Sequence, residues 1–424
     1  MTVNCDGSLS RRRYGASARL ANLTNRKEEA VKRATLACAA GVLVVATGVA
    51  QAQSSVRLYG LVDEGITYTN NQKGSSNVQQ TGNRAGGSRW GLRGVEELSD
   101  GWKALFTLES GFRPNDGTFS QASREFGRQA FVGIAKTGIG RLTLGHQYDP
   151  IADLVARFAG SGIWSPATHI GDNDNLNQTF RINNAAKFRS DAIGGFTVDA
   201  LYGFSNQANS GNGQGFGNNR AWGIAANYVS GPFSIGGGYV VLNRPDAKSN
   251  TSGAVGGPLA SDDYGGVLFY GLDGGVERQQ IAAVGGKYVF GPTTVGFAFS
   301  QSRLNYNDGS SRKFNNYDAN LQYLLKPAVT LIGVYTFTDG RADGLTGLSG
   351  KQLKPRWHQF TLGLDYALSA RTDLYLFGVY QLAAGDASTY VGSGYQKIAA
   401  IADVGTPSST NRQVAVLGGL RVKF

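Results

Sequence analysis

Alternation of apolar and polar residues along segments of about ten residues most constrains what this 424-residue chain can fold into. In the final segment, Val414, Val416 and Leu420 share one face, while Gln413 and Arg421 share the other. A period of two predicts a β-strand whose faces meet two different environments. Beyond the N-terminal region the sequence has no apolar run of 18 residues, so it predicts no transmembrane helix.

The sequence contains sixteen such segments, and the connections between them alternate in length. The segments are residues 56–69, 88–98, 101–112, 125–136, 140–149, 184–190, 195–205, 219–230, 232–243, 276–290, 292–306, 313–326, 328–339, 356–369, 372–384 and 411–424. Short turns alternate with long polar stretches, which is typical of outer-membrane barrels. Because lipid offers no hydrogen-bond partners to the backbone, the sheet must close on itself. We therefore expect an all-β fold: a 16-stranded antiparallel transmembrane β-barrel.

The first 52 residues are expected to form an N-terminal extension plus signal peptide, cleaved before Gln53, which leaves residues 53–424 as the barrel. Two basic residues precede an apolar run, residues 34–50, and Ala50-Gln51-Ala52 has the small-x-small pattern of a cleavage site. A short anchoring helix is the alternative. Cleavage would remove both cysteines together with eight basic and three acidic residues. The mature chain would then carry 33 basic and 27 acidic residues, a net charge of +6 rather than +11.

Groups that commonly carry catalysis or bind metals are scarce. The chain has three histidines, and the mature part has no cysteine, no paired-histidine spacing and no nucleophile elbow. The segment Asp172-Asn-Asp-Asn175 lacks the Gly and the bidentate Glu of a calcium loop. We expect no enzymatic activity, no cofactor and no bound metal. Nucleic-acid binding is not expected either, because the small net charge is spread along the chain.

The expected barrel implies a channel. A barrel of sixteen strands is wider than its inward side chains can fill, so it encloses water. The internal stretch 150–183 shows no strand pattern and is too short to form a plug domain. We expect this stretch, called loop 3, to constrict the lumen.

Several motifs together resemble the trimeric general porins of Gram-negative outer membranes, in particular the β-proteobacterial and neisserial-type branch. The motifs are Ser55-Val-Arg-Leu-Tyr-Gly60, Ser88-Arg-Trp-Gly-Leu-Arg-Gly-Val-Glu-Glu97, Thr107-Leu-Glu-Ser-Gly-Phe112, Phe126-Gly-Arg-Gln-Ala-Phe-Val-Gly133, Leu142-Thr-Leu-Gly-His-Gln147 and the terminal Phe424. The resemblance runs over the whole mature chain. It implies a homotrimer, with loop 3 folded into the lumen and a basic wall facing acids on that loop.

The resemblance also implies which residues form the constriction. The basic ladder falls on Arg89, Arg128 and Arg181, and we add Arg57 and Arg93 as further wall cations. The acidic side consists of Glu109 on the wall and of Asp153, Asp172 and Asp174 on loop 3. Alternation puts Arg89 and Arg93 opposite Trp90 and Leu92, and Arg128 opposite Phe131. Because charge at the lipid midplane costs about 2–4 kcal/mol, the arginines should face water. Gln147 departs from the family pattern, where arginine is frequent.

We therefore expect an outer-membrane porin for passive diffusion of small hydrophilic solutes and ions, with modest anion selectivity. The alternative is a substrate-selective channel for phosphate, a sugar or an organic acid; an outer-membrane enzyme or adhesin would need features that the sequence lacks. Expected partners are the homotrimer, outer-membrane lipid, lipopolysaccharide and the barrel-assembly machinery, for which Phe424 would be the recognition end. Four tyrosines near short turns are expected to form a girdle at the lipid boundary: Tyr228, Tyr288, Tyr323 and Tyr366.

Overall fold

The computed structural model describes residues 54–208, 215–245, 247–256, 264, 275–344, 352–385, 389–391 and 394–424. The expected extension, signal peptide and cleavage site before Gln53 lie outside the described residues. Among the described residues, no helix is long and apolar enough to cross a membrane.

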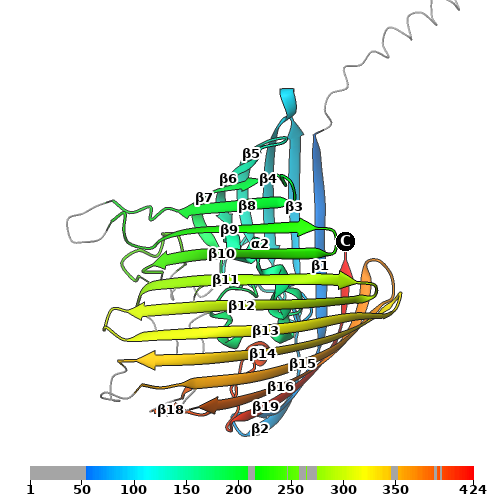
Figure 1. The fold of residues 1–424 in the computed structure, drawn as a ribbon, viewed down its shortest axis with the longest axis vertical. Coiled ribbons are helices and arrows are strands. Elements are labelled where there is room, and N and C mark those ends of the chain that lie inside the picture. Colours follow the sequence, from blue (N-terminus) through cyan, green and yellow to red (C-terminus); the bar gives the residue numbers. More distant parts are fainter. Residues whose placement is uncertain are drawn as a thin grey trace, which may run out of the picture. The chain divides into compact units, whose positions relative to one another are not determined.

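All sixteen predicted strands are present (Figure 1). They are β1 (Ser55–Gln72), β3 (Arg89–Glu97), β4 (Trp102–Gly111), β5 (Gln129–Lys136), β6 (Gly140–Gln147), β7 (Ile182–Ser190), β8 (Phe196–Gly203), β9 (Arg220–Ser230), β10 (Phe233–Asn243), β11 (Val276–Phe290), β12 (Thr293–Tyr306), β13 (Ser311–Lys326), β14 (Val329–Asp343), β15 (Pro355–Ala367), β16 (Thr372–Gly385) and β19 (Arg412–Lys423). Three short strands lie in the described parts of the long loops: β2 (Ser75–Gln80), β17 (Thr389–Val391) and β18 (Gly394–Gln396).

The sheet closes where its first and last strands meet. β1 pairs with β3 on one edge and with β19 on the other, and the β1–β19 register runs from Leu61↔Lys423 to Thr69↔Ala415. Gly60 and Phe424 exchange two backbone hydrogen bonds of 3.0 Å at the end of this seam. Each strand in the ring is antiparallel to its neighbours, so the barrel has no unpaired edge. The predicted closed 16-stranded fold is confirmed.

Alternation sorts the side chains between the outside and the lumen. In β1, Val56, Leu58 and Ile66 are exposed on the outer face, whereas Asp63 and Thr67 are fully buried on the lumen face. The four girdle tyrosines lie on the outer face at the short-turn end, as predicted: Tyr228, Tyr288, Tyr323 and Tyr366. An apolar exterior around a polar interior is the arrangement that lipid requires of a barrel.

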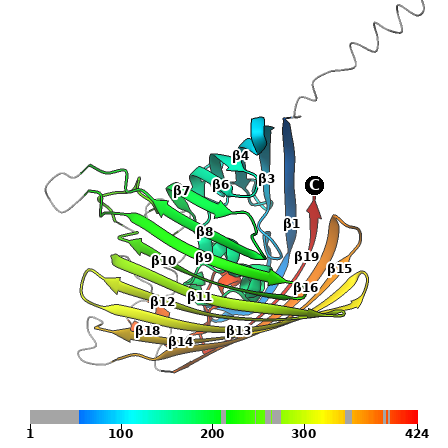
Figure 2. The ribbon, with the colours of Figure 1, turned by 45° about the horizontal axis from the view of Figure 1, so that its top comes forward.

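The wall differs in height around the ring. Strands β3 to β8 have 8 to 10 residues, whereas β11 to β16 have 13 to 16 (Figures 1 and 2). An eight-residue strand is about 26 Å long, and a tilt of about 40° reduces its height to about 20 Å, less than the apolar band of about 25 Å. The segment from β3 to β8 therefore forms a low wall.

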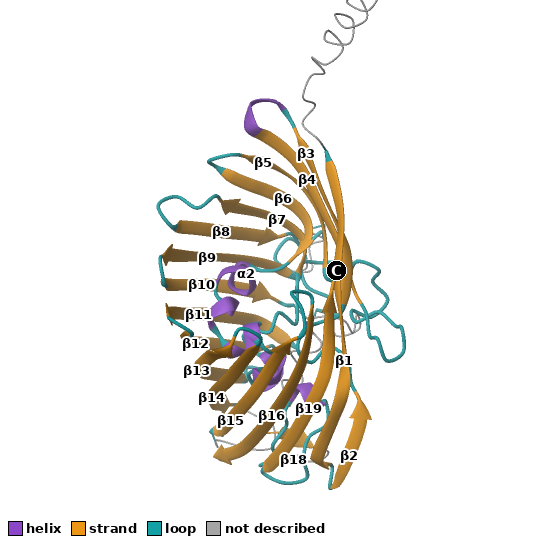
Figure 3. Cartoon of the chain, turned by 90° about the vertical axis from the view of Figure 1, so that its right-hand side faces the viewer, coloured by secondary structure: helices purple, strands orange, loops and turns teal. Residues whose placement is uncertain are grey.

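Loop 3, between β6 and β7, lies within the ring of strands (Figure 3). It contains five short helical turns: α2 (Pro150–Leu154), η2 (Ala156–Phe158), α3 (Gly160–Ile163), η3 (Ser165–Ala167) and η4 (Ile170–Asp172). Asp149 caps α2 by accepting from the backbone amides of Ile151 (2.8 Å) and Ala152 (3.1 Å), and Pro150 suits the first helical position. Burial raises the pKa of Asp149 to about 6.

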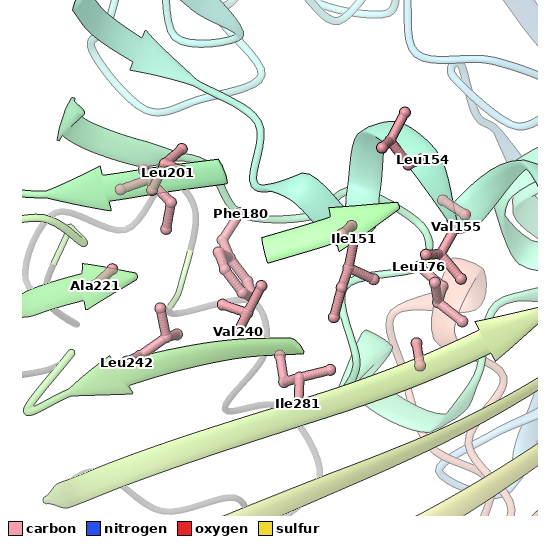
Figure 4. Packing of buried hydrophobic residues seen from close by; sticks show 14 of the residues in the cluster. Ile151, Leu154, Val155, Leu176, Phe180, Leu201, Ala221, Val240, Leu242 and Ile281 are labelled. Carbon is pink, nitrogen blue, oxygen red and sulfur yellow. The ribbon is translucent and has the colours of Figure 1, made fainter. Parts of the chain in front are cut away.

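Apolar packing fixes loop 3 against the wall. Ile151, Phe180 and Leu176 pack with Val240 and Ile281 of β10 and β11 (Figure 4). Farther along, α3 contacts β13, and η3 contacts β14, β15 and β16. In the described part of the chain, two further short helices lie outside loop 3: η1 (Ser99–Gly101) and η5 (Ala402–Val404). Loop 3 thus reaches from the β6–β7 side of the lumen to the opposite wall.

Candidate functional site

A cavity of about 490 Å³ separates loop 3 from the part of the wall near the barrel seam. We call this cavity the eyelet. It is lined by Leu61, Asn83, Ala85, Gly86, Gly87, Ser88, Arg89, Ser120, Gln121, Arg128, Ser161, Gly162, Ile163, Ser165, Asn177, Gln178, Thr179, Arg181, Arg421 and Lys423. Five lining residues are cations, whereas none of these residues is an acid.

Three of the cations are the predicted ladder residues Arg89, Arg128 and Arg181. The other two, Arg421 and Lys423 of β19, were missed. The alternation of the final segment had already placed both on the face away from lipid, so the signal was available in the sequence. What the sequence did not show was that β19 lies beside β1 at the same height as the ladder.

Glu109 holds two of the ladder arginines. Its side chain is buried on the lumen face of β4, and its Oε1 accepts from Arg128 Nε at 2.8 Å. Its Oε2 accepts from Tyr59 Oη at 2.8 Å and lies 3.9 Å from Arg89 Nε. Glu109 was predicted as a wall acid, and the structure places it behind the ladder as its counter-ion rather than in the lining.

Tyr148, at the start of loop 3, joins the remaining ladder contacts. Its hydroxyl oxygen accepts from Nη2 of Arg128 and from Nη2 of Arg181, both at 2.8 Å. The Arg181 guanidinium also lies 4.7 Å from the centre of the Tyr148 ring, within cation–π range. One phenol therefore fixes two like charges side by side. Sequence reasoning missed Tyr148, because its role depends on contacts between β5, loop 3 and β7.

The two β19 cations share a second carboxylate. Asp373 of β16 lies 3.0 Å from Arg421 Nε and 3.3 Å from Lys423 Nζ. Arg421 Nη1 also donates to the backbone oxygen of Ala85 at 2.9 Å. The neighbouring buried Asp63 accepts from the amides of Ala85 and Gly86 at 2.7 and 2.6 Å. These bonds hold the backbone at the lip of the eyelet next to the seam.

The eyelet is lined by charge of one sign. Five cations line it, and the carboxylates of Glu109 and Asp373 lie against four of them, Arg89, Arg128, Arg421 and Lys423. On the opposite side, loop 3 contributes the neutral polar residues Ser161, Ser165, Asn177 and Gln178. The described lining thus has one strongly basic side and one neutral side.

The loop 3 acids, expected to face the ladder, do not line the eyelet. Asp172 is buried and accepts from the amides of Asn177 (2.8 Å) and Thr179 (3.1 Å), so it shapes the loop's own backbone. Burial and the neighbouring charge of Asp174 raise the pKa of Asp172 to about 7. Asp153 pairs instead with Lys187 and Arg189 of β7. Asp153 and Asp172 thus have partners within the protein, and their place on the acidic side of the constriction stays a prediction.

Asp174 is also absent from the lining, because it anchors loop 3 to the wall. It is fully buried, lies 2.7 Å from His169 Nδ1 and accepts from Ser300 of β12. His169 Nε2 lies 3.6 Å from Asp318 of β13. Burial opposes charging of the ring, but the two carboxylates raise the pKa of His169 to about 10. Asp174 is therefore paired within a buried ion cluster, and its place on the acidic side of the constriction stays a prediction.

Comparison with known proteins places this architecture in a family. The sequence profile of the Gram-negative porins matches residues 37–386. The chain belongs to the Gram-negative porin family. An outer membrane porin protein of Bordetella pertussis is 31% identical over 383 residues, covering 81% of this chain and 92% of the relative. Outer membrane porin protein 32 of Delftia acidovorans is 29% identical over 351 residues, covering 78% and 85%. This porin is accordingly a protein of the bacterial outer membrane.

Solved structures share the fold of this porin. An anion-selective porin from Comamonas acidovorans aligns with a TM-score of 0.65 at 22% identity, over 88% of this chain and 100% of that chain. The outer membrane protein OmpT of Vibrio cholerae, in a trimer form, aligns with a TM-score of 0.57 at 15% identity, over 88% and 99%. At these identities the likeness supports the barrel itself.

Two further wall cations of the porin lie away from the eyelet. Arg57 and Arg93 are register partners on the lumen face, and the Arg93 guanidinium lies 4.1 Å from the centre of the Tyr59 ring. Neither lines the eyelet. Arg93 is four residues along β3 from Arg89, about 13 Å towards the short-turn end. Their role at the constriction stays a prediction, and alternation gives the face of the sheet but not the height along the barrel.

Arg128 does not follow the alternation that was expected for it. Arg128 precedes β5, so strict alternation does not govern its side chain. Phe131, expected on the lipid side, instead lies on the lumen face, since it is the register partner of Thr107. Arg128 reaches the eyelet through its bonds to Glu109 and Tyr148. Among the described residues, no group of three His, Cys, Asp or Glu side chains is placed to hold a metal ion.

Proposed function

We propose that this porin admits small hydrophilic solutes and ions by passive diffusion, with an anion preference set at the eyelet and no catalytic role. The observation that carries the proposal is the lining of the eyelet, which contains five cations and no acid. Fixed charges around a narrow aqueous pore raise the local concentration of counter-ions and lower that of co-ions. The Comamonas porin is described as anion-selective, which supports the same sign here.

Fixed geometry supports selection by charge rather than by gating. Asn320 Nδ2 donates to the Phe158 oxygen of loop 3 at 2.9 Å, and Gly160 N donates to both oxygens of Asp318 at 3.1 and 3.0 Å. Gln279 Nε2 donates to the Asn173 oxygen at 2.9 Å. Because loop 3 is bonded to several strands, the width of the eyelet is set by the barrel.

A substrate-selective channel is the less favoured function. It would need apolar rings exposed along the lumen, to hold a sugar or an organic acid. The lumen-facing rings of Trp357, Tyr375 and Phe377 are instead buried, in clusters with residues of loop 3 and of the last long loop. These rings support the loops rather than offering a binding track.

We also propose that the porin is a homotrimer joined through the low wall from β3 to β8. The eight-residue strands β5, β6 and β8 fall short of the apolar band by about 5 Å, so lipid would have to thin around them. Burial against two copies of the chain removes that mismatch. A trimer should migrate as a large species on a denaturing gel when unboiled and as a monomer after heating; identical migration in both samples would contradict it.

The two chain ends are proposed to serve export and assembly. Residues 1–52 would be removed before Gln53, and Phe424 would present the end of β19 to the barrel-assembly machinery. Mass measurement of the mature protein tests the first part. For the second, deletion of Phe424 should lower the amount of folded porin in the outer membrane; an unchanged amount would refute the assembly role.

The decisive experiment for selectivity is the zero-current potential across a planar bilayer containing the purified porin, under a tenfold KCl gradient. An anion-selective channel makes the dilute side negative, because chloride crosses faster than potassium. A potential of the opposite sign would overturn the proposal.

A further inference from the structure

A buried carboxylate of loop 3 holds the backbone of a segment that lines the eyelet. Oδ1 of Asp172 accepts from the Asn177 amide at 2.8 Å, and its Oδ2 accepts from the Thr179 amide at 3.1 Å. Both residues line the eyelet, as does Gln178 between them. We call residues 177–179 the lining segment. One side chain therefore fixes the two amides on either side of a lining residue.

The lining segment has a backbone that needs such support. Gln178 has a φ of 62°, in the left-handed region, which is unfavourable for a residue with a Cβ atom. A residue stays in this region where the surrounding contacts over-determine its conformation. Contacts that do so here include the two Asp172 bonds and the bond from the Gln178 amide to the Asn175 oxygen at 3.0 Å. Without the carboxylate bonds, Gln178 is less strongly held in this conformation.

The lining segment is also joined to a cation of the ladder. Nη1 of Arg181 donates to the Thr179 oxygen at 2.8 Å, while its Nη2 donates to Tyr148. Thr179 is thus bound at its amide by Asp172 and at its carbonyl oxygen by Arg181. A single residue connects the buried acid to a cation that lines the eyelet.

Asp172 differs from the other two acids of loop 3 because it makes no ion pair with a described residue. Asp153 and Asp174 both pair with basic side chains. Burying a charge is costly unless the charge is paired or hydrogen-bonded. The hydrogen bonds that the Asp172 carboxylate accepts come from the lining segment. The structural effect of this buried charge is therefore concentrated on the eyelet.

We propose that Asp172 is a positioning residue for ion selectivity: its carboxylate orders the lining segment and thereby keeps Arg181 in the eyelet. The proposal rests on the proposed anion preference. It gives Asp172 a role through contacts, whereas an acid facing the pore would act through the field of its charge. The two roles predict opposite results when the charge is removed. Disorder of the lining segment lets Arg181 leave the eyelet and lowers the anion preference, whereas loss of a negative charge facing the pore would raise it.

Reversal potentials of the unchanged porin, D172N, R181Q and the double variant test the proposal. Asparagine keeps the shape of the side chain, but it offers one acceptor and places an amino group against the second amide. D172N should lower the ratio of anion to cation permeability by between about 1.5-fold and fivefold in 0.1 M KCl, the upper limit being the loss of a full charge at about 5 Å. Because Asp172 acts through Arg181, D172N should cause no further change in R181Q. A higher ratio in D172N, or additive changes in the double variant, would overturn the proposal.

D153N is the matched control. It removes the same charge from the same loop, but Asp153 pairs with Lys187 and Arg189 of β7 and not with the lining segment. Its effect on the permeability ratio should therefore add to that of R181Q. Non-additive changes would mean that any loosening of loop 3 acts through Arg181, and they would contradict a specific role of Asp172. Cation preference in the unchanged porin would overturn the proposed function instead, since the comparison between variants does not depend on its sign.

The pH dependence of the same ratios gives an independent measurement. Burial and the charge of Asp174 raise the pKa of Asp172 to about 7. Burial disfavours charge on Asp174 and His169 as well, but their pairing outweighs it: the pKa of Asp174 is lowered, and that of His169 is raised to about 10. Near pH 7, Asp172 therefore changes its charge while these two neighbours keep theirs. A protonated carboxyl group cannot accept from both amides, so it resembles the asparagine of D172N.

The permeability ratios of the unchanged porin and D172N should consequently converge as the pH falls from about 8.5 to about 5.5. A constant difference over this range would refute the positioning role. Should D172N not fold, the unchanged porin and R181Q provide the same test. The effect of removing the Arg181 charge should shrink over the same pH range, and an effect independent of pH would count against the proposal.

Discussion

Replacing Arg89 with glutamine tests whether the eyelet charge sets selectivity. The substitution removes one of the five lining cations while Arg128 still pairs with Glu109. The number of lining cations falls from five to four. We expect the ratio of anion to cation permeability to fall.

The size of the change follows from the dimensions of the eyelet. A sphere with the cavity volume of about 490 Å³ has a radius of about 5 Å, which we take as the distance between the Arg89 charge and a permeating ion. At that distance in water, a unit charge changes the energy of a monovalent ion by about 0.8 kcal/mol. With a Debye length of about 10 Å in 0.1 M salt, this falls to about 0.5 kcal/mol. Removing the charge raises the energy of an anion in the eyelet and lowers that of a cation by the same amount. The ratio of anion to cation permeability should therefore change about fivefold. In 1 M salt, where the Debye length is about 3 Å, the change should be below about twofold.

Reversal potentials at both salt concentrations give these ratios directly. Arg93→Gln is the matched control: it changes the same residue type on the same strand and face, but about 13 Å from Arg89. Its ratio should change by less than about 1.5-fold in 0.1 M salt. If Arg93→Gln shifts the potential as much as Arg89→Gln, or if the Arg89 effect is independent of salt, local charge at the eyelet is not the cause.

Three other substitutions probe the supports of the eyelet and the seam. Tyr148→Phe keeps the ring but removes the acceptor that holds Arg181, so we expect larger current noise and a conductance change in single-channel recordings; identical traces would contradict the positioning role. The paired His169 stabilises the porin fully below its ordinary pKa of about 6.5, and this contribution is lost as pH rises through its raised pKa of about 10. The melting temperature of His169→Gln should therefore differ most from the unchanged porin near pH 6, and a constant difference up to pH 10.5 would refute the pairing. A side chain at Gly60 would lie 2.5 Å from the terminal aromatic ring, so Gly60→Val should lower the yield of folded barrel, while Gly378→Val, where nothing lies within 4 Å of an added Cβ, should not.

Alternation predicted the barrel well because it is a local property. Each strand exposes one face to lipid, so residues two apart report the same environment, and sixteen strands followed from the chain alone. The same signal places Arg89, Arg93 and Arg421 on the lumen face. It does not give height, which depends on how strands stagger around the ring. That is why alternation treated Arg89 and Arg93 alike, although only Arg89 lines the eyelet, and why Arg421 was missed.

Loop 3 could not be read in the same way, since it has no repeating pattern. Which of its acids face water depends on partners more than 100 residues away, such as Ser300 for Asp174. Asp172 is directed towards the amides of its own loop, a local contact that resemblance to a family does not reveal. Alternation also fails at strand ends, as Arg128 shows. The side chain of a residue just outside the strand is not held to one face of the sheet.

The ion pairs formed by the loop 3 carboxylates link the fold to the proposed selectivity. A loop that crosses an aqueous lumen must be fixed to the wall by polar contacts, and in this porin Asp153 and Asp174 supply them as buried ion pairs. A carboxylate used in this way is neutralised and does not contribute to the field in the pore. Glu109 and Asp373 lie against the eyelet cations, but neither carboxylate is among the lining residues. Anchoring of the loop therefore removes negative charge from the constriction, and the basic wall is left to determine the sign of the selectivity.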